Sequence, residues 1–352
     1  MENIKSRISH IDAIRGFMML LVIYGHLMLY LTPTPISDIK YFFGHFRMPL
    51  FFFIAGFFLY TDNYSKGLFK RRSINRLARQ LYPTIIFWAL FSLAFIPETW
   101  PDSWLTKYKG GYWFTYVSVE MFFLVAPLLM ALTIRNCSKK VKILAMIAVC
   151  AIVEVIFYIT SLTDYYILPD AVYGFLSWEL VAVYLPYVIL GIVAKMYIDK
   201  FNQICRSAKW LVALIAIFIA TYIYRETLSD YQVIEKIVPY VLAFSGIIIC
   251  NIIFSSLYRF TFVAESRIMK GLTFIGTSTL EIYLLHYFIV FGVKSISDLT
   301  TAGEMLDSIC NTVFELPVYI VLSVIVAEIC LFAVYQLKNT GIYRFLFPDP
   351  KH

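Results

Sequence analysis

The sequence predicts an all-α protein that crosses a membrane about ten times. Of its 352 residues, 60% are hydrophobic and only 15% are charged, whereas soluble domains average about 25% charged residues. Apolar runs recur along the whole chain, and about 20 apolar residues in a helix suffice to cross a bilayer core. We therefore expect residues 1–352 to form a single transmembrane domain, with no segment left over for a soluble domain of ordinary size.

Hydrophobic runs place the ten helices in order. The predicted ranges are 14–31, 41–60, 80–97, 113–134, 141–161, 176–194, 209–224, 236–258, 271–293 and 313–337. We expect the first to be retained, because no small-residue cleavage site follows it at Leu29. The third follows a basic segment and begins near Tyr82 and Pro83, and the fourth opens at Tyr112. The seventh is short, which is compatible with tilting or with extension by its flanks.

The loops predict the orientation. If the N-terminus is cytoplasmic, 23 of the 30 lysines and arginines fall in cytoplasmic segments and seven fall outside. Cytoplasmic loops of membrane proteins carry this excess, so both termini are expected inside. The net charge of +7 then needs no nucleic-acid partner. Of the six cysteines only Cys310 falls outside, so we expect no disulfide framework.

Arg15 and His26 are the most informative pair. They lie eleven residues apart on the first predicted helix, with no charge between them. Eleven residues turn a helix by about 1100°, about 20° past three turns, and rise roughly 16 Å. Both side chains therefore point the same way, one at the cytoplasmic rim and one at mid-depth. Ionisable groups inside spans are costly and lean functional, although His26 could be a hydrogen-bonding strut between helices.

Other ionisable or polar side chains fall toward the outer half of the spans. The candidates are His45, Arg47, Glu120, Glu281, Tyr283 and His286. Arg47 could instead extend to lipid headgroups. For Glu154 and Glu328 a structural role is at least as well supported. His26, His45 and His286 could in principle bind zinc, but nothing in their spacing requires it, and we expect no metal.

The segment before the third helix is strongly basic. It carries six cations between residues 66 and 79 and no anion after Asp62. Arg76 and Arg79 are one turn apart on one helical face, and Arg72 precedes them by a further turn. One interpretation is a loop that fixes topology and attracts anionic lipid. The other is a set of guanidiniums that hold the phosphates of a nucleotide-like ligand. The spacing does not decide between them.

Taken together, these segments resemble the membrane-bound acyltransferase 3 family. The resemblance rests, in the family's order, on Asp12–Gly16 with His26, His45–Gly56, Arg76–Pro83, Tyr112–Phe114, Leu185–Gly191 and Ser278–His286. The ten-helix layout agrees with it. Within the family, the chain most resembles the fucose-4-O-acetylase-like and polysaccharide O-acetyltransferase members. We expect no appended soluble hydrolase-like domain.

The resemblance implies transfer of an acetyl or other short acyl group from cytoplasmic acyl-CoA, with acetyl-CoA as donor, to a hydroxyl of a cell-surface glycan or its lipid-linked precursor. The expected location is the bacterial cytoplasmic membrane. The expected CoA-binding residues are Arg15, Arg72, Arg76 and Arg79. The expected catalytic residues are His26 and Glu281. The expected acceptor-binding residues are His45, Arg47, Glu120, Tyr283 and His286.

Two questions stay open at this level. His26 acts either as a general base or as an acylated nucleophile, with Glu281 orienting its ring or taking the proton. The chain could also be a transporter of lipid-linked glycan or a non-catalytic subunit of a polysaccharide assembly complex. An acyl-CoA enzyme needs both the Arg15–His26 pair and the Arg76–Arg79 pair, whereas a transporter needs neither.

Overall fold

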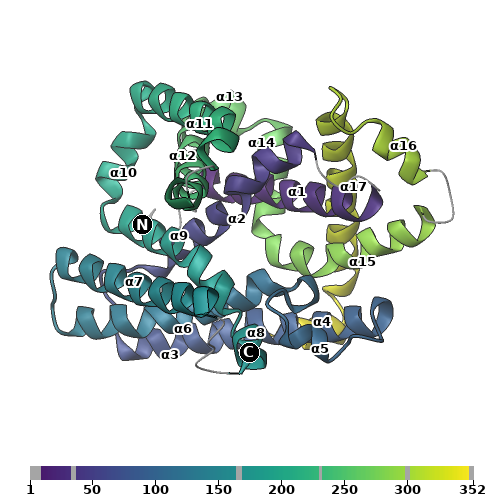
Figure 1. Cartoon of the computed structure of the whole chain (residues 1–352). Coiled ribbons are helices and arrows are strands. Elements are labelled where there is room, and N and C mark those ends of the chain that lie inside the picture. The colour runs from purple at the N-terminus through teal and green to yellow at the C-terminus, as the bar shows by residue number, and fades with distance from the viewer. Residues whose placement is uncertain (1–8, 33–36, 164–168, 230–231, 298–301, 349–352) are drawn as a thin grey trace. The chain divides into compact units, whose positions relative to one another are not determined.

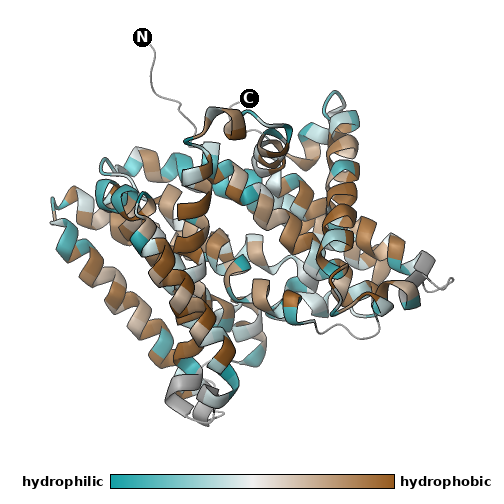
Figure 2. Cartoon of the chain, turned by 90° about the horizontal axis from the view of Figure 1, so that it is seen from above, coloured by the Kyte–Doolittle hydropathy of each residue, from teal (hydrophilic) through white to brown (hydrophobic). Residues whose placement is uncertain are grey.

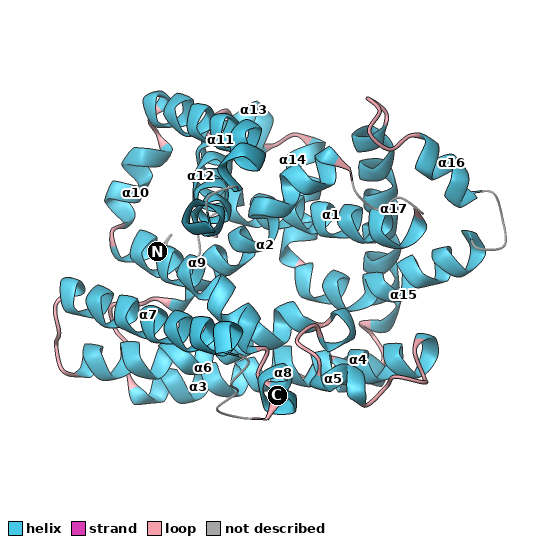
Figure 3. Ribbon diagram, viewed as in Figure 1, coloured by secondary structure: helices cyan, strands magenta, loops and turns pink. Residues whose placement is uncertain are grey.

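The computed structural model describes residues 9–32, 37–163, 169–229, 232–297 and 302–348, and these form helices with no strand among them (Figure 3). The long helices are α1 (Ser9–Leu31), α2 (Asp38–Leu59), α6 (Trp113–Ile134), α7 (Lys139–Thr163), α9 (Trp178–Met196), α11 (Ala208–Ser229), α12 (Gln232–Leu257), α15 (Thr279–Ser297) and α17 (Glu315–Leu337). The shorter ones are α3 (Lys66–Arg76), η1 (Leu77–Leu81), α4 (Tyr82–Phe95), α5 (Asp102–Leu105), η2 (Lys109–Gly111), α8 (Asp170–Phe175), α10 (Ile198–Cys205), α13 (Thr261–Ala264), α14 (Arg267–Thr277), α16 (Ala302–Ser308) and α18 (Gly341–Leu346).

The described helices confirm the predicted all-α membrane class. Nine helical stretches in the described ranges are long and apolar enough to cross a bilayer, and α14 with α15 makes a tenth if that bent pair is one span. Apolar residues predominate along these helices, and the connections between them are more polar (Figure 2). The seventh predicted span is longer than expected and runs over Ala208–Ser229.

Two elements differ from the prediction in shape. The basic segment is a helix rather than a loop, because α3, the π-helix η1 and α4 follow one another without a break from Lys66 to Phe95. The ninth predicted helix, 271–293, is bent by 87° between α14 and α15. Three polar residues in a row, Thr277, Ser278 and Thr279, lie at the bend, whereas the predicted helix runs straight through them.

The chain divides into two compact units, which we describe separately. The first unit comprises Met1–Phe51 and Asp199–Val334, and the second comprises Phe52–Ile198 and Tyr335–His352. The prediction of a single domain stays a prediction.

In the first unit, α1 packs along α14 and α15 (Figure 1). The contact between α1 and α14 is backbone against backbone. A Cβ added at Gly16 would lie 1.9 Å from the carbonyl oxygen of Leu272, and one added at Gly276 would lie 1.7 Å from that of Asp12. Only glycine allows this approach, so the two positions hold α14 against the first turns of α1.

The helix α11 packs against α12 in the same unit, yet only 6% of its apolar window is buried. Its inner side carries aromatic rings: the Phe218 ring lies 5.1 Å from that of Phe42 on α2, and Tyr222 lies 5.3 Å from the same ring. The remaining face is apolar and exposed, as expected of a helix that faces lipid.

In the second unit, hydrogen bonds and ring contacts join α2, α4, α6 and α9. The Thr84 hydroxyl on α4 donates to that of Thr115 on α6 over 2.8 Å. The Phe52 ring at the C-terminal part of α2 stacks on Tyr184 of α9, which also stacks on Trp113 of α6. These contacts fix the frame in which the basic segment lies.

Candidate active site

Arg15 and His26 are both directed at α15 in the first unit. The Arg15 Nη2 donates to the Thr279 hydroxyl over 2.5 Å, at the first residue of α15, while Nη1 pairs with Asp12 over 3.1 Å. Eight residues further along α15, the Tyr287 hydroxyl lies 3.1 Å from Nε2 of His26. The two side chains therefore share one face of α1, and α15 runs parallel to that face.

His26 lies in a cluster of aromatic and imidazole rings. Its ring centroid is 4.7 Å from that of Tyr287, 5.2 Å from that of His286 and 6.1 Å from that of Tyr30. Tyr283 completes the cluster, 5.8 Å from His286. Among the described residues, Nδ1 of His26 has no hydrogen-bond partner. The site thus holds a half-buried imidazole with one nitrogen on a tyrosine hydroxyl and the other without an internal partner.

The backbone of α15 fixes the tautomer of His286. Its Nδ1 lies 2.7 Å from the carbonyl oxygen of Tyr283 and 3.2 Å from that of Ile282. Since a carbonyl oxygen only accepts, Nδ1 carries the hydrogen, and Nε2 of the neutral ring is an acceptor. This Nε2 is buried without a partner in the described part of the chain. His286 therefore presents a lone pair close to His26.

Arg47 reaches this region from α2. Its Nη1 donates to the carbonyl oxygen of Leu21 on α1 over 2.7 Å. The guanidinium lies against Gly25, where an added Cβ would fall 2.0 Å from Nη1. A cation is thereby held beside the residue that precedes His26.

The structure does not bring His45 to this cluster. Two residues from Arg47, and so about 200° around the helix, the His45 ring lies 4.6 Å from that of Tyr41 and 6.1 Å from that of Tyr222. Its Nε2 is buried without a hydrogen-bond partner among the described residues. Glu281 lies in the first turn of α15 and is partly exposed, five residues before His286.

A family model described as an acyltransferase domain matches residues 8–332. The chain belongs to the acyltransferase 3 family. No curated protein and no solved structure gives a match to it. Family membership together with the long apolar helices makes the chain a multi-pass membrane acyltransferase.

In this acyltransferase Arg72, Arg76 and Arg79 of the basic segment differ in their surroundings. Arg72 donates to the carbonyl oxygen of Leu59 over 2.6 Å, at the last residue of α2, where a cation complements the helix end. Arg76 donates to the side chain of Gln80, whose amide in turn donates to the carbonyl oxygen of Thr115 over 3.0 Å. Arg72 and Arg76 therefore also tie the basic helix to its neighbours.

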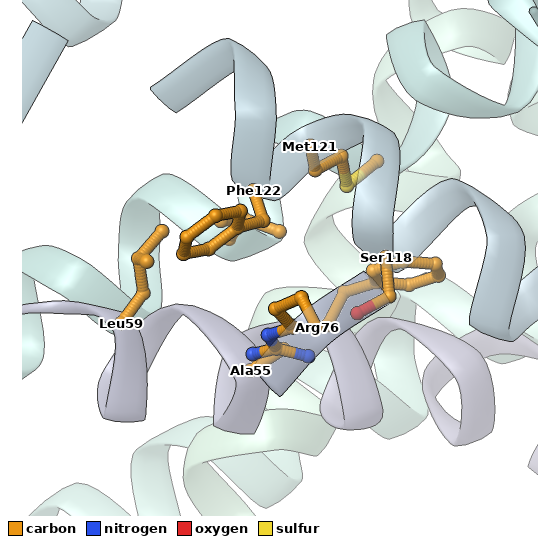
Figure 4. Close-up of a pocket in the computed structure, with 8 residues that line it drawn as sticks. Ala55, Leu59, Arg76, Ser118, Met121 and Phe122 are labelled. Carbon is orange, nitrogen blue, oxygen red and sulfur yellow. The ribbon is translucent and has the colours of Figure 1, made fainter. Parts of the chain in front are cut away.

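Arg76 lines a small cavity between α2, α3 and α6 (Figure 4). Its guanidinium lies 5.6 Å from the centre of the Phe122 ring, close to Ala55 and Ser118. Arg79, by contrast, is exposed. The π-helix η1 starts between the two residues, and their common face stays a prediction.

Glu120 lies in the second unit, near Lys109. One of its carboxylate oxygens is buried without a hydrogen-bond partner among the described residues. Burial lowers the pKa of Lys109 to about 8, and the charge of Glu120 acts in the opposite direction. In the described part of the chain no three His, Cys, Asp or Glu side chains are grouped to hold a metal ion.

Sequence reasoning missed Tyr287 and Thr279, the partners of His26 and Arg15. Both lie more than 260 positions away in the sequence. A weak signal was present, since Tyr287 directly follows His286 and lies one turn after Tyr283.

Proposed function

We propose that this membrane acyltransferase moves an acetyl or other short acyl group from cytoplasmic acyl-CoA to a hydroxyl of a glycan or its lipid-linked precursor. The observation that carries the proposal is the alignment of Arg15 and His26 on α15, through Thr279 and Tyr287. About 16 Å of helix rise separates the two side chains, which suits the long pantetheine arm of acetyl-CoA. A transport function alone would not explain why the chain belongs to an acyltransferase family.

The proposed reaction is a direct acyl transfer. The acceptor hydroxyl oxygen attacks the thioester carbonyl carbon, an ester C–O bond forms and the C–S bond breaks. His26 takes the hydroxyl proton and returns it to the leaving sulfur. In the alternative, a nitrogen of His26 first takes the acyl group and then passes it to the acceptor. In either route we assign His286 a supporting role. Its buried Nε2 is available to accept a hydrogen bond.

Arg15 is the cation proposed for the donor at the mouth of this path. Its side chain is 28% exposed, so a CoA phosphate has access to it, and a guanidinium pairs well with phosphate oxygens. Arg79 is also exposed and therefore accessible to a phosphate. Arg72 and Arg76 would have to serve the donor while retaining their internal contacts.

The proposal also assigns sides and partners. In the proposed orientation both termini are cytoplasmic, so residues 61–79 would lie inside the bacterial cytoplasmic membrane, where acyl-CoA is found. The acceptor would approach from the outer side. His45, Arg47, Glu120, Tyr283 and His286 stay candidates for binding it, and Glu281 stays a candidate for orienting the base. No metal takes part in the proposed route.

The test is transfer of radiolabelled acetyl groups from acetyl-CoA to candidate glycans by purified protein. His26→Ala is expected to reduce transfer at least about 100-fold, the lower range for a general base. His10→Ala removes a histidine from the same helix, next to Tyr258 rather than the cluster, and should retain activity. Wild-type transfer by His26→Ala at equal folded amount would refute the assignment.

The same protein distinguishes the two routes. Incubation with acetyl-CoA without acceptor, followed by mass spectrometry, should give acetylated His26 only in the nucleophilic route. Arg15→Ala should weaken acyl-CoA binding more than acceptor binding, since it removes a phosphate contact.

A further inference from the structure

The second unit contains a pocket that the proposed reaction does not use. It has a volume of about 520 Å³ and lies between α7, α8, α9 and the segment that precedes η2. Pockets of about 300–1,000 Å³ are the usual size for small-molecule sites. Three of the residues that line it are aromatic: Phe157, Tyr173 and Trp178. Three more are charged: Lys107, Asp170 and Glu179.

We propose that this pocket, called here the Trp178 pocket, binds a neutral sugar ring of the glycan acceptor; the identity of that ligand as the acceptor rests on the proposed function. Aromatic rings offer flat apolar surfaces for the C–H face of a pyranose. Carboxylates accept charge-assisted hydrogen bonds from its hydroxyls. Trp178 lines the pocket, and its Nε1–H is buried without an acceptor among the described residues.

The charges of the lining indicate which ligands are excluded. Lys107 already pairs with Glu179 over 2.6 Å, and Asp170 adds a second carboxylate. One cation against two carboxylates leaves a net negative lining. Phosphates of CoA and acidic sugars are therefore disfavoured, whereas a neutral ring is not. The charge of the pocket is therefore opposite to that of the arginines proposed to bind the donor.

The pocket wall is held rigidly by a buried lysine. Lys109 is fully buried, and its Nζ donates to the carbonyl oxygens of Thr106 over 2.8 Å and of Gly174 over 2.6 Å. The Ser177 hydroxyl donates to the carbonyl oxygen of Lys107 over 3.1 Å. Gly174 approaches the carbonyl oxygen of Leu105 so closely that an added Cβ would lie 1.9 Å from it. These contacts preorganise Lys107 and the α8–α9 junction around the cavity.

The experiment is calorimetric titration of the purified full-length protein with neutral methyl glycosides of glucose, galactose, fucose and N-acetylglucosamine. The methyl glycoside of glucuronic acid serves as the anionic counterpart of glucose. We expect at least one neutral glycoside to bind, and the glucuronic acid glycoside to bind at least five-fold more weakly than the glucoside. Asp170→Asn and Glu179→Gln should each weaken neutral binding at least five-fold. Glu98→Gln, an exposed carboxylate in the same unit but outside the pocket, should leave it unchanged.

Asp170 is exposed, so its variant is not expected to unfold the protein. Absence of any glycoside binding, unchanged affinity in both pocket variants, or preference for the glucuronic acid glycoside would overturn the proposal. The titration needs no acyl-CoA. Binding without transfer would therefore reject the proposed function alone, whereas transfer with an unchanged acceptor KM in both variants would reject the pocket alone.

Discussion

The close approach of α1 and α14 allows a quantitative test of the frame that holds Arg15. In Gly276→Ala the new Cβ would lie 1.7 Å from the carbonyl oxygen of Asp12, whereas ordinary contact begins near 3.4 Å. The helices must separate by about 1.7 Å, because the obstructing atoms belong to the backbone of Asp12 and Gly16 and cannot rotate away as a side chain could. Overpacking of this kind typically costs about 1–3 kcal/mol. We expect the thermal midpoint to fall by several degrees and the Arg15–Thr279 contact to weaken.

A matched control lies on the same helix. At Gly271 an added Cβ meets nothing within 4 Å, and alanine is favoured over glycine in a helix interior by roughly 0.5–1 kcal/mol. Gly271→Ala should therefore leave the thermal midpoint, measured in one detergent for all proteins, unchanged or slightly raised. An equal midpoint in the two variants would show that α1 and α14 do not approach as described. Acyl-CoA affinity, measured alongside, should fall only in Gly276→Ala.

Three further outcomes are expected. Tyr287→Phe removes only the hydroxyl 3.1 Å from His26 and should lower kcat several-fold, as loss of about one hydrogen bond predicts; an unchanged kcat would separate Tyr287 from the reaction. Because burial lowers the pKa of Lys109 from 10.5 to about 8, the unfolded chain binds more protons within that window. Stability should rise with pH there, and Lys109→Met should flatten the rise in thermal midpoint. In sealed cells an impermeant maleimide should label Cys310 and not Cys137; the reverse pattern would invert the topology.

The sequence predicted the helices well where the signal is local. The eleven-residue spacing of Arg15 and His26 was sufficient to put both on one face, because helical geometry is fixed by residue number. The π-helix η1, which begins between Arg76 and Arg79 and changes the number of residues per turn there, was not predicted. Nothing in the hydropathy of that segment marks such a change.

Hydrophobic periodicity does not predict which helices, distant in the sequence, contact one another. That His286 and Tyr287 meet His26, while His45 meets Tyr222, depends on which helices pack together. The 87° bend at Ser278 lies within a short polar stretch, Thr277–Thr279, and such a stretch does not by itself specify a bend. Gly16 and Gly276 carried a hint of it, since two small residues let helix backbones approach, but a single sequence does not say which glycines face each other.

Because one face of α11 is exposed, we expect the thickness of the bilayer to affect the position of this helix. Its apolar segment Ala208–Thr227 has 20 residues, about 30 Å of helix, close to the hydrocarbon thickness of an average membrane. Since little protein surrounds α11, its tilt is expected to change when the bilayer becomes thicker or thinner. Tyr222 would move with it, and that side chain both contacts the His45 ring and donates to the carbonyl oxygen of Asp38 over 3.1 Å. Lipid chain length in reconstituted vesicles therefore acts on the surroundings of His45 without any change in sequence.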